Sequence, residues 1–175
     1  MRPSPHTRLP LLAALPTLLI LLGGCASPAP RAAPLPPDEV IKAAQQKLTD
    51  RCLTRQGLTP PRPDGRRPSA AEQRRVARAL FGTGRTELSL TLPTGHSVRA
   101  HTDGCLAAAQ RELYGDQKRW FHVSTVVNNL KPEAAHTHRT LTEVRARHRE
   151  DLTEWHRLRT TALTQAKTHL TANPT

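Results

Sequence analysis

Three cysteines carry the most distinct chemistry in this chain of 175 residues. A thiolate is a nucleophile, and two thiols can be oxidised to a disulfide bond. Cys25 directly follows an uncharged apolar run, whereas Cys52 and Cys105 stand in segments with helical patterns of apolar residues. The sequence therefore predicts one role for Cys25 and a different, shared role for the other two.

The apolar run before Cys25 belongs to a predicted secretory signal peptide that covers residues 1–24. Its head carries Arg2 and Arg8 and no acidic residue, and residues 9–22 are uncharged and mostly apolar. A basic head, a short apolar middle and small residues at the end are typical of an export signal. The run is shorter than the roughly 20 residues that a membrane-spanning helix needs, and prolines interrupt it. We therefore expect export rather than a membrane span.

The end of this leader resembles the lipobox of bacterial lipoproteins, a pattern of Leu, two small residues and Cys, here Leu22, Gly23, Gly24 and Cys25. The resemblance implies that the Cys25 thiol receives a diacylglyceryl group, and that cleavage after Gly24 leaves Cys25 as the lipidated N-terminus. It also implies a location on the outer face of the cell membrane, held there by the lipid. Each buried CH₂ contributes about 0.8 kcal/mol, so two or three acyl chains anchor stably. The alternative is an ordinary secreted protein that is cut elsewhere, with Cys25 as a spare thiol.

Residues 25–37 form the predicted tether of this lipidated Cys. The stretch is rich in Pro and Ala, and such a composition favours extended, disordered chain at about 3.1 Å per residue. A helical extracytoplasmic domain is then expected over residues 38–172. The tether would hold that domain away from the membrane.

The domain is predicted to be mainly α, with one β-hairpin. Helix starts are indicated by Asp and Glu in a first turn, by Ser-x-x-Glu capping boxes and by single capping residues, and helix ends by glycines. Strict alternation of apolar and polar residues indicates strands. These signals predict a helix from Asp38 to Gly57 and a second helix that is opened by Ser69–Glu72 and ends near Gly82. A hairpin follows, formed by Glu87–Leu92 and His96–Ala100 and packed through Leu88, Leu90 and Leu92. Two more helices are then predicted, one capped by Thr102 or Asp103 that ends at Gly115, and one from Asp116 to Leu130.

A long C-terminal helix is the best hint of an interaction surface in the sequence. From Lys131 to Leu170 the only Gly or Pro is Pro132, which a first helical turn tolerates. Apolar residues step by threes and fours along it, at Leu141, Val144, His148, Leu152, Trp155, Leu158, Ala162, Ala166 and Leu170. One continuous helix would reach roughly 55–60 Å, so it must bend, protrude or pack along a partner. The alternative is a break without a sequence signal, or fraying at the Thr/Ala-rich end.

Cys52 and Cys105 are predicted to form a disulfide. An exported chain meets an oxidising exterior, and both residues lie on or beside apolar helix faces. The bond would close a loop of about 53 residues and contribute on the order of 4 kcal/mol. Two free buried thiols are the alternative.

The segments around these cysteines resemble small exported lipoproteins of high-GC Gram-positive bacteria. They are Asp50–Gly57, which reads DRCLTRQG, and Gly104–Gly115, which reads GCLAAAQRELYG. The resemblance covers the mature domain loosely and implies no activity. It supports the paired cysteines and the membrane-anchored location.

The histidines and acids indicate neither a metal site nor a catalytic set, and the sequence predicts no cofactor. His136 and His138 are two residues apart, so a helix places them on opposite sides. His101 and Cys105 have ligand spacing, but the disulfide would use the thiol. His148 sits in the apolar stripe, where it is expected to be a boundary residue with satisfied nitrogens. No nucleophile elbow or phosphate-binding loop is present.

The remaining clue is charge, since 26 Lys and Arg against 14 Asp and Glu give a formal charge of +12. Arginines cluster at residues 66–78 and 145–159 and suit anionic lipids or phosphate-rich wall polymers, although they also serve solubility. Export excludes intracellular nucleic acid. We therefore expect a non-catalytic lipoprotein that binds an envelope protein or an anionic wall component. The alternatives are an envelope enzyme whose site assembles from dispersed His and acidic residues, and a passive spacer.

Overall fold

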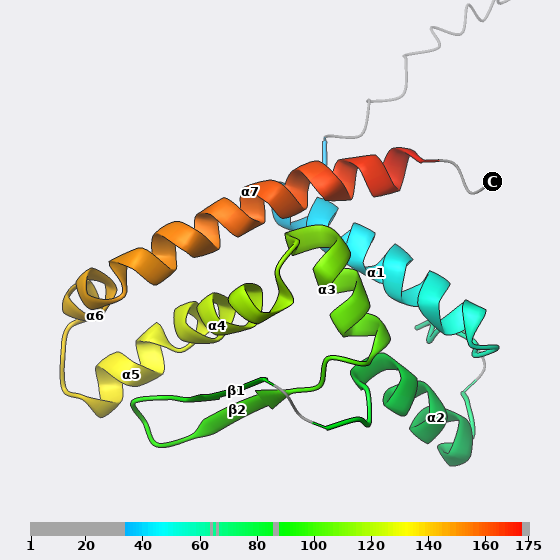
Figure 1. Ribbon diagram of the computed structural model, residues 1–175, viewed down its shortest axis with the longest axis horizontal. Helices are drawn as coiled ribbons and strands as arrows, with labels where there is room; N and C mark the ends of the chain where they lie inside the picture. Colours follow the sequence, from blue (N-terminus) through cyan, green and yellow to red (C-terminus); the bar gives the residue numbers. More distant parts are fainter. Residues whose placement is uncertain (1–33, 64, 66, 86–87, 173–175) are drawn as a thin grey trace, which may run out of the picture. The chain divides into compact units, whose positions relative to one another are not determined.

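The computed structural model describes residues 34–172 except 64, 66 and 86–87, and these form helices and one hairpin (Figure 1). The elements are α1 (Pro37–Arg55), α2 (Ala70–Phe81), β1 (Leu88–Thr91), β2 (Ser97–Ala100), α3 (Cys105–Tyr114), α4 (Gln117–Asn128), α5 (Leu130–His136), α6 (Leu141–Arg147) and α7 (Arg149–Thr171). The predicted fold class is confirmed: mainly α, one hairpin, one disulfide and a long C-terminal helix. Residues 1–24, Cys25 and most of the tether lie outside the described residues.

The main core lies where α7 crosses α1, α3 and α4. Its buried residues are Ile41, Ala44, Leu48, Ala109, Leu113, Tyr114, Val123, Leu158, Ala162 and Ala166. Alanines at the α7 positions let that helix approach its neighbours closely. The α1–α7 contact is also closed by Lys47, whose Nζ donates to the carbonyls of His169 at 2.8 Å and Ala172 at 3.1 Å. These carbonyls lack partners within the helix, so the lysine serves as a distant C-cap.

A second, smaller core joins the hairpin to the other end of the domain. Val126, Leu130, Ala134 and Val144 are buried there, and Leu90 packs against them. Strand β1 pairs antiparallel with β2, with Leu88 opposite Ala100 and Leu90 opposite Val98. Leu88 and Leu92 are also buried, so the predicted packing of the hairpin through its leucines is confirmed.

Local capping signals were reliable where side chain and backbone form a closed motif. Ser69 and Glu72 form the predicted capping box of α2, with the Glu72 carboxylate accepting from the Ser69 N–H at 2.7 Å. Asp116 caps α4 as predicted, because its side chain accepts from the Arg119 N–H at 2.9 Å.

The predicted start of α1 differs by one residue, and the predicted cap of α3 is wrong. Helix α1 begins at Pro37, one residue before the predicted domain boundary, and Asp38 lies in its first turn without capping it. Neither Thr102 nor Asp103 caps α3, whose N-cap is Gly104. A Cβ on Gly104 would lie 2.5 Å from the Leu80 carbonyl oxygen. The chain therefore passes tightly against the end of α2. Asp103 instead accepts hydrogen bonds from the backbone N–H groups of Thr83 and Gly84, in the loop that follows α2.

The prediction of one continuous helix from Lys131 to Leu170 is also wrong, and the alternative of a break is confirmed. The break falls between α5 and α6, where His138 adopts a φ of 53°. Thr140 and Glu143 then form a second capping box, which starts α6. The helix ends again at His148 before α7. The apolar stripe nevertheless faces the domain, with Val144, Leu158, Ala162 and Ala166 buried. The stripe is core rather than a free interaction surface.

The predicted disulfide is present between Cys52 in the last turns of α1 and Cys105 at the start of α3. The Cα atoms are 5.6 Å apart, and the bridge spans 53 residues of sequence. Cys105 is buried and Cys52 half-buried. Among the described residues, no helix combines the length and the apolar character needed to cross a bilayer.

Candidate functional site

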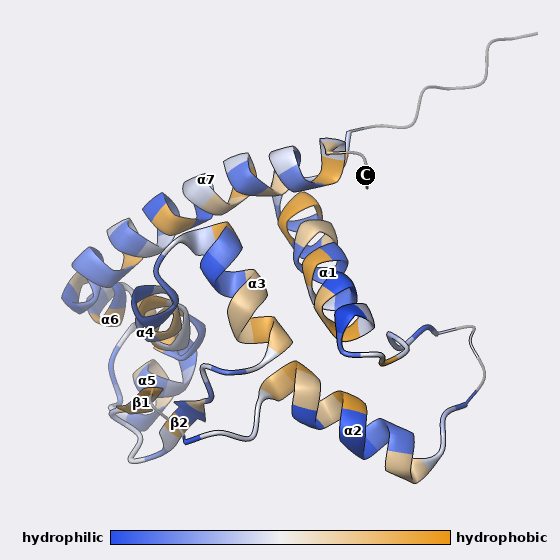
Figure 2. Ribbon diagram, turned by 45° about the vertical axis from the view of Figure 1, so that its right-hand side comes forward, coloured by the Kyte–Doolittle hydropathy of each residue, from blue (hydrophilic) through white to orange (hydrophobic). Residues whose placement is uncertain are grey.

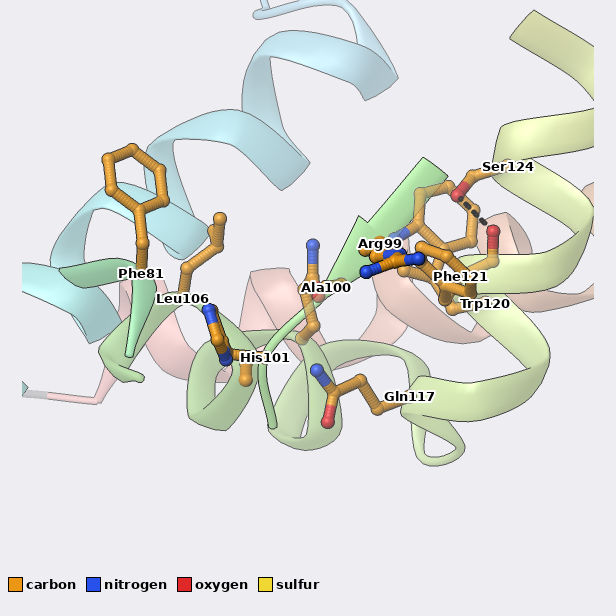
Figure 3. A pocket seen from close by; sticks show the side chains of 11 residues that line it. Phe81, Arg99, Ala100, His101, Leu106, Gln117, Trp120, Phe121 and Ser124 are labelled. Carbon is orange, nitrogen blue, oxygen red and sulfur yellow. Dashed lines mark hydrogen bonds between the residues drawn. The ribbon is translucent and has the colours of Figure 1, made fainter. Parts of the chain in front are cut away.

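A cavity of about 270 Å³ opens where α2, β2, α3 and α4 meet, and Figure 3 shows its walls. Strand β2 and the residue after it contribute Arg99, Ala100 and His101. Helix α4 contributes its first turns, and α2 contributes its last residue. The complete lining is Phe81, Arg99, Ala100, His101, Leu106, Ala107, Gln110, Gln117, Trp120, Phe121 and Ser124.

The wall formed by α4 is held firmly by neighbouring packing. The Trp120 ring stacks on the Tyr114 ring with centroids 3.7 Å apart and planes 8° apart. Tyr114 is buried in the main core. Burial raises the pKa of the Tyr114 hydroxyl to about 12, because the charged form is poorly solvated there. The phenol therefore stays neutral, and Trp120 is presented to the cavity from a fixed position.

Gln117 is the most informative polar residue of the cavity, because it is only 7 % exposed. Its Oε1 accepts from Arg111 Nη1 at 3.1 Å, and the same nitrogen donates to the Thr102 carbonyl at 2.8 Å. A guanidinium only donates hydrogen bonds, so the contact fixes which end of the amide is oxygen. The Nε2 group then lacks a hydrogen-bond partner among the described residues, and it keeps some contact with solvent. Such a group favours an acceptor from water or a ligand.

The cavity also carries a positive charge from Arg99. Within the described part of the chain, the Arg99 guanidinium has neither an ion-pair nor a hydrogen-bond partner, and the lining contains no Asp or Glu. Arg99, Trp120 and Phe121 all line this cavity, and Figure 3 labels them. A cationic group, an amide donor without a protein partner and aromatic walls can together hold a small molecule with an anionic end and a flat apolar body.

A second cluster brings acids and histidines together between α5 and α7. His148 Nε2 lies 2.9 Å from Glu133 Oε2, and His148 Nδ1 lies 3.0 Å from Asp151 Oδ2. Asp151 Oδ1 also lies 3.3 Å from His122 Nε2, and Arg147 Nη1 lies 3.6 Å from Glu133 Oε1. Each nitrogen of the His148 ring therefore has a carboxylate partner. Because both nitrogens are bonded, the cluster is a structural clasp, and the prediction of a satisfied boundary histidine is confirmed.

Helix α2 presents a different kind of surface. None of its 12 residues is buried, and Phe81 is 57 % exposed. One side carries an apolar stripe, which Figure 2 shows in orange along α2. That stripe borders a second cavity of about 490 Å³, which we call the α2 groove. The apolar walls of this groove are Leu58, Pro60, Pro61, Pro68, Val76, Ala77, Leu80 and Phe81.

The sequence-predicted site residues fall into two groups. Cys25 and the lipobox residues Leu22, Gly23 and Gly24 lie outside the described residues, so their roles stay predictions. Cys52 and Cys105 are brought together as predicted. In the described part of the chain, no group of three or more His, Cys, Asp or Glu side chains has an arrangement that could hold a metal ion.

The cavity between β2 and α4 was missed from sequence. Gln117 follows the Asp116 cap directly, and a polar residue at the first helical position usually faces solvent. Here its side chain accepts from Arg111 of the preceding helix α3 and lines a cavity shared with β2. No local sequence pattern predicts that contact.

Comparison with protein-family models, with curated proteins and with solved structures finds no match to this chain.

Proposed function

We propose that this chain is a membrane-anchored extracytoplasmic lipoprotein, held through a lipid on Cys25, whose domain is a non-catalytic binding module for a small anionic ligand. The leader and its lipobox-like end support the anchor. The Cys52–Cys105 disulfide is consistent with a chain that folds in an oxidising compartment. The resemblance to small exported lipoproteins of high-GC Gram-positive bacteria points the same way.

The observation that carries the binding role is the Nε2 donor of Gln117, which has no protein partner among the described residues, in a cavity whose described lining holds no carboxylate. A donor without a protein partner gains from an acceptor that enters the cavity. Arg99 adds a positive charge at the same cavity, and charge-assisted hydrogen bonds are about twice as strong as neutral ones. These groups favour a carboxylate over a neutral carbonyl.

An envelope enzyme with a site assembled from His and acidic residues is the second candidate, because Glu133, His148 and Asp151 do converge. A general base needs a free nitrogen within reach of a substrate proton. Both nitrogens of His148 are already bonded to carboxylates, and the cluster lines neither of the two cavities. We therefore favour binding over catalysis.

The test is a titration of the native lipidated chain in non-ionic detergent with benzoate, and with benzamide as its neutral counterpart. Side-chain ¹⁵N resonances of Arg99, Gln117 and Trp120 are the readout. The proposal expects saturable shifts with benzoate that weaken at least tenfold for benzamide. The variant Arg99→Gln should lose most of the affinity, whereas Arg67→Gln, an exposed arginine outside this cavity, should not. Equal shifts with both compounds, or none at these side chains, would contradict the binding role.

A further inference from the structure

Helix α2 is amphipathic and well capped, yet it contributes no buried residue to either core. Its apolar residues lie at positions 76, 77, 80 and 81, which a helix places along one stripe. A globular domain normally covers such a stripe. Here the stripe borders an open groove, and Phe81 at its end is more than half exposed.

The charged residues of α2 are placed around this stripe. Arg74 and Arg78 precede Phe81 by seven and three residues, so helical geometry puts all three on the same side of α2, with Phe81 at its C-terminal end. Arg75 lines the groove itself. Cationic side chains that flank an exposed aromatic ring match the boundary between lipid headgroups and acyl chains.

The arginines of α2 are also available for a partner, unlike several on α7. Arg157 is paired with Glu154 at 2.7 Å, and Arg159 with Asp38. Arg74, Arg75 and Arg78 are exposed and have no ion-pair partner among the described residues. From 67 to 85 the chain holds five arginines and one glutamate. This surface is therefore a concentrated, uncompensated positive charge next to uncovered apolar side chains.

We propose that α2 lies on the anionic headgroup surface of the membrane that holds the lipid anchor, with Phe81 and the groove at the acyl boundary. This inference rests on the proposed lipid anchor at Cys25. Only eleven residues separate Cys25 from Pro37, a contour of at most about 40 Å, so a membrane surface is always near the domain. A phosphate-rich wall polymer would pair with the arginines but would leave Phe81 and the apolar groove uncovered.

The experiment uses the native lipidated chain in vesicles of phosphatidylcholine alone or mixed equally with phosphatidylglycerol. Flotation in 1 M salt reports the anchor, and amide hydrogen exchange over residues 70–81 reports docking of α2. We expect exchange at least tenfold slower on the anionic vesicles, with the protection lost in high salt. The triple variant R74Q/R75Q/R78Q should remove the protection, because about 1 kcal/mol per basic residue corresponds to roughly 100-fold weaker docking.

A matched triple variant, R139Q/R145Q/R149Q, removes the same charge at the other end of the domain and should keep the protection. The variant Phe81→Gln should weaken it. Equal exchange on both vesicles would overturn the docking of α2 while leaving the anchor intact. Protection by soluble polyphosphate on neutral vesicles, equal to that on anionic vesicles, would assign the surface to a wall polymer instead and would also overturn it. Failure to float would count against the anchor itself.

Discussion

The contact between the Glu133 carboxylate and the His148 ring should contribute strongly to the stability of the folded domain. The Glu133 side chain is 4 % exposed, and its Oε1 has no hydrogen-bond partner within the described ranges of the chain. The 2.9 Å contact of Oε2 with His148 is therefore its principal compensation, since Arg147 is more distant at 3.6 Å. Replacing His148 by Leu leaves a buried carboxylate without that contact. Breaking a buried pair in this way costs about 3–5 kcal/mol.

Urea unfolding of His148→Leu at neutral pH measures this cost directly. A fall of about 3–5 kcal/mol would be a large part of the roughly 5–15 kcal/mol that stabilises a domain. The double variant Glu133→Met/His148→Leu replaces both polar side chains by apolar ones and should recover most of the loss. Glu154→Gln is the matched control, because that carboxylate pairs with the exposed Arg157 and should cost less than about 1 kcal/mol.

Two outcomes would refute this reasoning. A loss below about 1 kcal/mol in His148→Leu would mean that Glu133 is solvated or neutral in the fold. A double variant as unstable as the sum of its singles would mean that the two side chains are not coupled.

Three further predictions address the framework around the cavity. Reduction of the Cys52–Cys105 bond should lower the free energy of unfolding by about 4 kcal/mol, because it frees a loop of 53 residues; a loss below about 1 kcal/mol in urea melts would contradict this. Gly104→Ala should cost about 2 kcal/mol or more, since the new Cβ meets the Leu80 carbonyl; unchanged thermal stability would show that the approach relaxes freely. The backbone N–H groups of Thr83 and Gly84 lower the pKa of Asp103, so its contribution is present above pH 3.8 and lost as pH falls through the folded pKa. The stability gap between the wild type and Asp103→Asn should therefore shrink from pH 6 to pH 3, and a constant gap would contradict the assignment.

The parts of the fold that sequence predicted are those with closed local signals. The Ser69–Glu72 box, the Asp116 cap and the alternating strand around Leu90 each depend on neighbours within a few residues. Such signals survive because the chain satisfies the same hydrogen bonds in isolation and in the fold. The disulfide was predicted from the apolar faces of its helices and from the expected oxidising exterior.

One error had a usable signal. Thr140-x-x-Glu143 has the same capping pattern as Ser69-x-x-Glu72, but the prediction did not use it and gave as its alternative a break without a signal. The stripe persists across the break because α6 and α7 bury the same side. Periodicity thus predicted which side is buried correctly and the continuity of the helix incorrectly.

The other misses depend on tertiary contacts. Asp103 bonds to a loop twenty residues earlier in the chain, because Gly104 packs against the end of α2. The burial of Gln117 and the uncovered stripe of α2 depend likewise on how separate elements meet. No local sequence pattern predicts those tertiary contacts. The arginine cluster at residues 66–78 was recognised from sequence, whereas the cavity and the uncovered apolar stripe of α2 required the structure.

The central claim is that the mature chain begins at Cys25 and carries lipid on its sulfur. Mass spectrometry of tryptic peptides from the native membrane fraction tests it most directly. The account predicts a peptide Cys25–Arg31 whose mass is increased by a thioether-linked diacylglyceryl group. An unmodified peptide that runs from Leu9 through Arg31 would contradict it, because the leader would then be retained and the thiol free.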